Sequence, residues 1–91
     1  MNDQVLRRYV RDDRLVGFPA RWTRKLAVLG HVSTHTFVPG ERYDEQTVNE
    51  RLGPWCDGGP VDHVALRRYL VDVGYLSRAG GEYWMTGPAL S

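Results

Sequence analysis

Two adjacent arginines in the stretch DHVALRRYLVDVG, Arg67 and Arg68, are the residues of this chain best suited to recognition chemistry. A guanidinium group donates hydrogen bonds in a planar fork, which matches both the edge of guanine in the DNA major groove and the oxygens of a phosphate. Val64 and Val71 fall on the same helical face and can contact thymine methyl groups. This face is therefore suited to duplex DNA. The alternative is that one arginine pairs with Asp72 or another carboxylate and organises the domain internally.

Histidine and cysteine residues give weaker chemical signals. His31 and His35 are four residues apart, a spacing at which two imidazoles on a helix can bind one metal ion, and Cys56 or His63 could complete the site. No CxxC spacing accompanies them, so we expect no metal site and no cofactor. Asp57, next to Cys56, disfavours the thiolate that a nucleophile needs, so we expect no enzymatic activity.

A helix over about residues 61–73 positions the two arginines. Its predicted core face comprises Leu66, Tyr69, Leu70 and Val73. Gly74 ends this helix, and two short strands follow around Gly80-Gly81, which can adopt the positive φ of a tight hairpin turn. Arg78 is the basic residue of this hairpin, and Glu82 is its predicted partner. On the hairpin, Tyr83 or Trp84 is predicted to be exposed.

The preceding part of the chain predicts three further helices. The first spans residues 3–13, and the second spans about residues 20–33 with Trp22 on its core face. Residues 41–43 form a short edge strand. Asp44 is the predicted N-cap of the third helix, which Gly53 and Pro54 close. Residues 53–60, GPWCDGGP, are predicted to be irregular, with Trp55 turned inward.

The order helix, helix, short strand, helix, helix, hairpin predicts a mainly α (α+β), winged-helix-like fold. It has about four helices and a C-terminal β-hairpin wing. Ninety-one residues fit a single domain over 1–91, in which residues 1–16 supply the additional N-terminal helix.

Charge is distributed unevenly along the chain, although the formal net charge is only +1. Residues 5–25 carry seven Arg or Lys and two Asp, a local net charge of +5, whereas residues 41–62 carry two Arg and six Asp or Glu, a local net charge of −4. The arginines at positions 7, 8, 11 and 14 can track a phosphate backbone, or they can form a solvated helix face. The acidic third helix opposes DNA binding, because that element usually lies close to phosphates in a DNA-binding winged helix.

The sequence also bears on localisation. No apolar run reaches the length of about 18 residues that a membrane span requires. The first residues carry charge where an export signal would need an apolar stretch. A single cysteine cannot form an internal disulfide. We therefore expect a cytoplasmic protein that does not insert into a membrane.

Three stretches resemble a short bacterial domain-of-unknown-function family: P-G-x-R-Y over residues 39–43, V-N-E over residues 48–50, and L-R-R-x-L-V-D-x-G-x-L-x-R over residues 66–78. The similarity extends from about Val5 to Met85. The resemblance implies a winged-helix-like fold and an association with transcription, because members occur alone or fused behind ArsR-type helix-turn-helix regulators. It implies no catalytic residues. The inserted stretch GPWCDGGP and the stretch HVSTHT depart from the family pattern.

We therefore expect a DNA-binding domain associated with transcriptional regulation. The predicted DNA-contacting residues are His63, Val64, Arg67, Arg68, Val71 and Arg78. Two alternatives remain: a module that binds a regulator protein or forms a homodimer through the same face, and a small-ligand sensor that uses the Trp55 loop as a lid.

Overall fold

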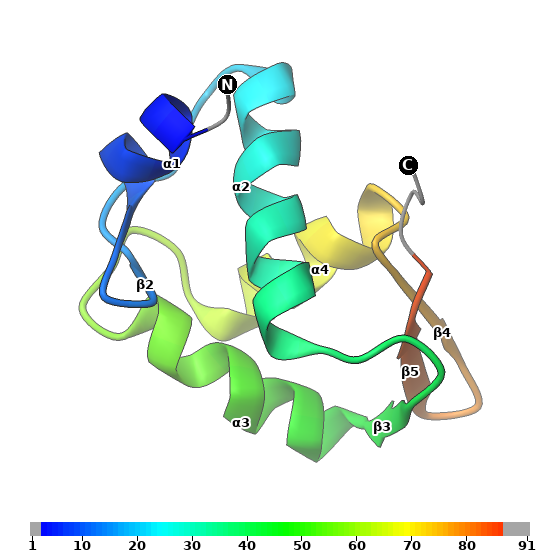
Figure 1. Ribbon diagram of the computed structural model, residues 1–91. Helices are drawn as coiled ribbons and strands as arrows, with labels where there is room; N and C mark the ends of the chain where they lie inside the picture. Colours follow the sequence, from blue (N-terminus) through cyan, green and yellow to red (C-terminus); the bar gives the residue numbers. More distant parts are fainter. Residues whose placement is uncertain (1–2, 87–91) are drawn as a thin grey trace.

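The computed structural model describes residues 3–86 (Figure 1). In chain order the elements are helix α1 (Asp3–Tyr9), strands β1 (Val10–Arg11) and β2 (Arg14–Leu15), helix α2 (Trp22–Thr36), strand β3 (Arg42–Asp44), helices α3 (Glu45–Cys56) and α4 (His63–Asp72), and strands β4 (Leu76–Ala79) and β5 (Glu82–Met85). Helices α2, α3 and α4 form the centre of the molecule, with α1 on one side and the sheet of β3, β4 and β5 on the other (Figure 1).

The three central helices enclose the hydrophobic core. Apolar side chains at helical spacing face one another, and seven of them have 0% exposed surface: Val28, Leu29, Val32, Val48, Leu52, Leu66 and Leu70. Removal of this apolar surface from water is the main favourable contribution to folding. The predicted core face of α4 is confirmed at Leu66 and Leu70, while Tyr69 and Val73 pack against the edge of the core.

The sheet is antiparallel with strand order β3-β5-β4. Tyr83 in β5 lies opposite Tyr43 of β3 on one side and Arg78 of β4 on the other. Gly80 and Gly81 adopt φ values of 58° and 80°, so the predicted hairpin turn is confirmed. The edge strand predicted at residues 41–43 is also confirmed, as β3, which pairs with β5. Three core helices followed by this hairpin make the molecule a winged-helix-like α+β fold, in which β4 and β5 form the wing.

The prediction of one helix over residues 3–13 was wrong. Helix α1 ends at Tyr9, and the chain reverses through a two-stranded ribbon in which Val10 pairs with Leu15. Asp12 and Asp13 form the turn with φ values of 52° and 59°, which Asp tolerates better than most residues. Burial explains the reversal, because it places the Leu15 side chain, with 1% exposed surface, in the core.

Helix α3 does not end at Gly53 and Pro54 as predicted, but continues to Cys56. Proline lacks an N–H group and so loses one helical hydrogen bond. The extra turn instead buries Trp55 to 5% exposure, and its indole Nε1 donates a 2.8 Å hydrogen bond to Thr36 Oγ1. Trp55 is therefore a core residue turned inward, as expected, but it cannot serve as a lid over a ligand.

Trp22 does not lie on the core face of α2 as predicted. Its side chain is 53% exposed, because it is the first residue of α2 and the buried residues of this helix begin only at Val28. The ammonium group of Lys25 lies 5.5 Å from its ring, a cation–π contact. Within residues 3–86, none of the helices has both the length and the apolar content needed to cross a membrane.

Candidate nucleic-acid interface

A hollow of about 210 Å³ lies between the outer face of α4 and the wing. Its lining brings together five of the six predicted contact residues with two neighbours: Val64, Arg67, Arg68, Val71, Asp72, Arg78 and Tyr83. The sixth, His63, is the partly buried first residue of α4 and lies outside this lining. Most of the predicted residues therefore share one surface, although Arg78 comes from a different element than the rest.

The rotation of α4 directs this surface outward. Asp62 caps the helix by accepting a 2.8 Å hydrogen bond from the Ala65 backbone N–H. Leu66 and Leu70 hold the opposite face in the core. As a result Val64 is 46% exposed and Arg68 is exposed. Among residues 4–86, no carboxylate lies within ion-pairing distance of Arg68, so Arg68 does not form the pair with Asp72 that was considered as the alternative.

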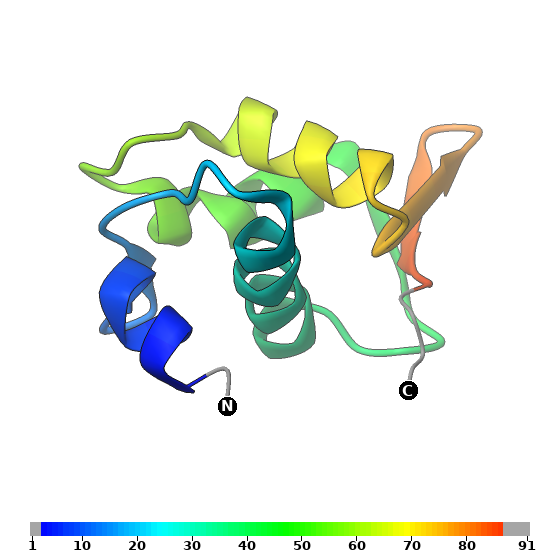
Figure 2. The ribbon, with the colours of Figure 1, turned by 90° about the horizontal axis from the view of Figure 1, so that it is seen from above.

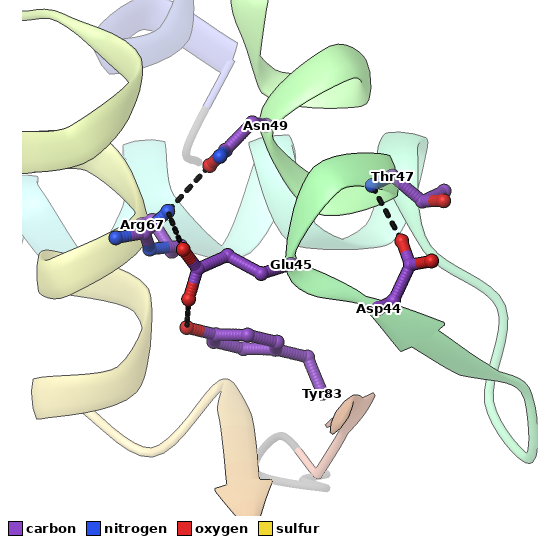
Figure 3. Close-up of polar contacts among 6 residues, drawn as sticks. All are labelled: Asp44, Glu45, Thr47, Asn49, Arg67 and Tyr83. Atoms are coloured by element: carbon purple, nitrogen blue, oxygen red, sulfur yellow. Dashed lines mark hydrogen bonds and ion pairs between the residues drawn. The ribbon is translucent and has the colours of Figure 1, made fainter. Parts of the chain in front are cut away.

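Arg67 behaves differently from its neighbour. Its Nη1 donates a 2.5 Å hydrogen bond to Asn49 Oδ1 and lies 3.8 Å from Glu45 Oε2, both on α3 (Figure 3). Only 17% of the Arg67 side chain is exposed. The guanidinium group therefore joins the two helices, which is the internal role that the sequence left open for one of the two arginines.

Glu45 connects this pair to the wing. Its second carboxylate oxygen, Oε1, accepts a 3.3 Å hydrogen bond from the hydroxyl of Tyr83 (Figure 3). Of the two hairpin aromatics, Tyr83 or Trp84, one was predicted to be exposed; alternation along β5 turns Tyr83 inward, to 1% exposure, while Trp84 is partly buried. Glu45, Arg67 and Tyr83 thus link α3, α4 and the wing and determine the shape of the hollow.

Arg78 extends the basic surface onto the wing. Its guanidinium carbon lies 5.6 Å from the centre of the Tyr83 ring, on the far strand of the hairpin. The predicted partner of Arg78, Glu82, instead lies 3.7 Å from Arg42, in a pair whose side chains are more than half exposed. Such exposed pairs contribute little to stability. Arg78 is consequently not neutralised by Glu82.

Acidic groups border the interface on the side of α3. Hydrogen bonds from Thr47, through its side chain and its backbone N–H, lower the pKa of Asp44, so this carboxylate is charged at neutral pH. Glu45 is engaged by Arg67 and Tyr83. Asp72 lines the hollow itself. The electrostatic potential is therefore most favourable for a phosphate near Arg68 and Arg78, away from α3.

Histidine and cysteine residues do not gather into a metal site. His35 Nδ1 contacts the carbonyl oxygen of His31 at 2.9 Å, and the His31 ring packs edge-on against Trp55. Within the described part of the chain, no group of three His, Cys, Asp or Glu side chains could hold a metal ion. Burial, together with the negative charge of Asp62, raises the pKa of Cys56 to about 11. The thiol is therefore protonated at neutral pH, which is unfavourable for nucleophilic chemistry.

The sequence reasoning did not identify the partners of Arg67. Glu45 and Asn49 are four residues apart, so both lie on one face of α3. That spacing was the available signal, and the V-N-E motif contains Asn49. This spacing does not give the position of α4, because Asn49 and Arg67 are 18 positions apart and their contact depends on how the helices pack.

Comparison with known proteins shows the family of this chain. Residues 14–85 match a family described as uncharacterized proteins conserved in bacteria (DUF2087). The chain belongs to this family. The DUF2087 match begins in β2 and ends in β5, so it contains the whole interface and leaves out α1. No curated protein and no solved structure matches the chain.

Proposed function

We propose that this DUF2087 protein binds duplex DNA through the outer face of α4 and the wing, as a module associated with transcriptional regulation. One observation carries the proposal: Arg68 from α4 and Arg78 from β4 line the same hollow, together with Val64 and Val71. A recognition helix and a wing are the two elements with which this fold approaches the DNA grooves. The proposed association with ArsR-type regulators, as a separate or a fused chain, rests on the family resemblance alone.

Each side chain of the interface has a distinct proposed role. Arg68 is exposed, so its guanidinium group can reach guanine or a phosphate. Arg78 contacts a phosphate from the wing, and Val64 meets a thymine methyl group. His63, at the first position of α4, lies at the edge of the same footprint. Arg67 does not contact DNA directly but positions α4 against α3, since Asn49 and Glu45 already hold it.

The acidic residues limit where the DNA backbone can pass. A phosphate beside Asp44 would be repelled, so the backbone follows the side of the hollow formed by Arg68 and Arg78. With few phosphate contacts, binding is expected to be modest in affinity and to weaken with salt in proportion to the number of those contacts.

The proposed role is not catalytic. The Cys56 thiol is the principal candidate nucleophile considered above, and its pKa of about 11 keeps it protonated at neutral pH. The described residues therefore offer more support for binding than for catalysis.

The experiment is fluorescence anisotropy of a labelled duplex pool of random sequence at about 50 and 200 mM salt. The double variant Arg68→Ala/Arg78→Ala should bind at least about tenfold more weakly. The slope of its log affinity against log salt concentration should be smaller by about 2, which corresponds to two lost phosphate contacts. The matched control is Arg42→Ala/Arg51→Ala, which removes the same charge from β3 and α3. Equal binding by the two double variants would rule out this interface.

A protein-binding role for the same face is the second candidate. It is favoured by the 46% exposure of Val64, because an exposed apolar side chain can dock against another protein or a second copy. Light scattering over a range of concentrations tests this role. A Val64-dependent dimer that forms without DNA would favour it, whereas a monomer that binds DNA would favour the first proposal.

A further inference from the structure

A second hollow, of about 110 Å³, lies between α1 and α2. Its lining consists of Gln4, Val5, Arg8, Tyr9 and Arg24. The two arginines come from different helices and both side chains are exposed. One water molecule needs about 10–15 Å³ of cavity space, so this hollow has room for a tetrahedral oxyanion.

The charges around this hollow favour an anion. Among residues 4–86, no carboxylate belongs to its lining and none pairs with Arg8 or Arg24. The amide of Gln4 adds a neutral hydrogen-bond donor. A phosphate in this hollow would gain charge-assisted hydrogen bonds from arginines of both helices. Asp12 and Asp13, the acidic residues of this basic segment, lie in the turn of the β1–β2 ribbon, between Arg11 and Arg14.

Helices α1 and α4 lie on opposite sides of α2 (Figure 2). The exposed face of α4 and the contact between α1 and α2 therefore lie on different sides of the molecule. We assign an anion bound at Arg8 and Arg24 to another molecule, or to another segment of the same DNA.

We propose that the hollow between α1 and α2 binds a backbone phosphate of a second DNA segment, so that one molecule can bridge two duplexes. The first duplex is the one assigned to α4 under the proposed function. The bridging of two duplexes rests on that proposed function, whereas phosphate binding in the hollow does not. Sequence plays no part at the second site, because phosphate contacts carry no base information. An acidic surface on a second copy of the chain is the competing occupant, and the experiment separates the two.

The experiment measures capture of a free labelled duplex by protein bound to an immobilised duplex, both of random sequence. Arg8→Gln/Arg24→Gln should abolish capture while single-duplex binding stays within about twofold of the wild type. The charge-matched control Arg42→Gln/Arg51→Gln should capture normally. Unchanged capture by Arg8→Gln/Arg24→Gln would overturn the inference. A dimer that forms without DNA and dissociates in Arg8→Gln/Arg24→Gln would assign the hollow to a second copy and would overturn the inference as well.

A second measurement separates this inference from the proposed function. In the Arg68→Ala/Arg78→Ala background, weak duplex binding should remain with a salt slope of about 1, because the hollow holds one phosphate. Adding Arg8→Gln/Arg24→Gln should remove this remaining binding. Complete loss of binding in Arg68→Ala/Arg78→Ala alone would refute the second site and support the first. Full binding in that variant, abolished by Arg8→Gln/Arg24→Gln, would support the second site and refute the first.

Discussion

Arg67 on α4 donates a 2.5 Å hydrogen bond to the side-chain oxygen of Asn49 on α3, whereas the next residue, Arg68, projects into solvent. Adjacent positions on a helix are about 100° apart, so one of the two side chains points along the α3–α4 contact and the other points away from it. Two residues of the same type thus have different roles, one in holding the helices together and one in recognition.

Replacement of Arg67 by Ala should destabilise the fold more than replacement of Arg68. Arg67→Ala removes a charge-assisted hydrogen bond and leaves Asn49 and Glu45 without their partner, so we expect the free energy of unfolding to fall by about 2 kcal/mol. Arg68→Ala should change it by less than about 0.5 kcal/mol, as is usual for an exposed position. Urea unfolding of both variants makes the comparison. Equal losses would contradict the division of roles.

Trp55 and Thr36 should be energetically coupled. The indole N–H of Trp55 donates to Thr36 Oγ1 at 2.8 Å and holds the last turn of α3 against the end of α2. In a double-mutant cycle of Trp55→Phe and Thr36→Val, we expect a coupling energy of about 1 kcal/mol. The cycle cancels the loss of ring volume that Trp55→Phe also causes. A coupling energy near zero would mean that packing alone extends the helix.

Gly53→Ala should be tolerated better than Gly74→Ala. Gly53 lies inside α3, and a Cβ atom at this position would have nothing within 4 Å apart from its chain neighbours. Alanine favours the helix and restricts the unfolded chain, but the Pro54 ring disfavours the helical conformation of the residue before it, so we expect the free energy of unfolding to change by less than about 0.5 kcal/mol. Gly74→Ala is the matched control, because Gly74 also has open space around it but adopts φ +88°. That variant should lose about 1 kcal/mol. Thermal unfolding of the pair makes the comparison.

Acidification should weaken the fold through His31. Burial, and then the nearby His35, lower the pKa of His31 below its ordinary value of 6.5, while Asp13 acts in the opposite direction. The folded state therefore prefers the neutral imidazole. The contribution of His31 to stability is fully present above pH 6.5 and is lost as the pH falls from 6.5 through the lower folded-state pKa.

The measurement is the urea midpoint at about pH 7.5 and about pH 5.5. The wild type should lose more stability between these values than His31→Gln, which cannot titrate at that position. If both proteins lose the same amount, other groups account for the acid sensitivity.

Local sequence patterns determined much of this protein. Asp44 as an N-cap, the Gly80-Gly81 turn and the buried face of α4 each depend on residues only a few positions apart, and all three were predicted. The outward placement of Val64 and Arg68 follows from the same periodicity, because fixing Leu66 and Leu70 in the core fixes the opposite face.

Tertiary packing decided the rest. The local rules end α3 at Pro54, but the burial of Trp55 against Thr36, 19 positions earlier in the chain, extends the helix by a turn. Likewise, helical periodicity turns Arg67 and Arg68 in different directions but does not say which of them meets α3, and the approach of Asn49 and Glu45 decides this. Hydrogen bonds and ion pairs form at distances of a few ångströms, so partners on different helices are defined only once the core has set how those helices pack.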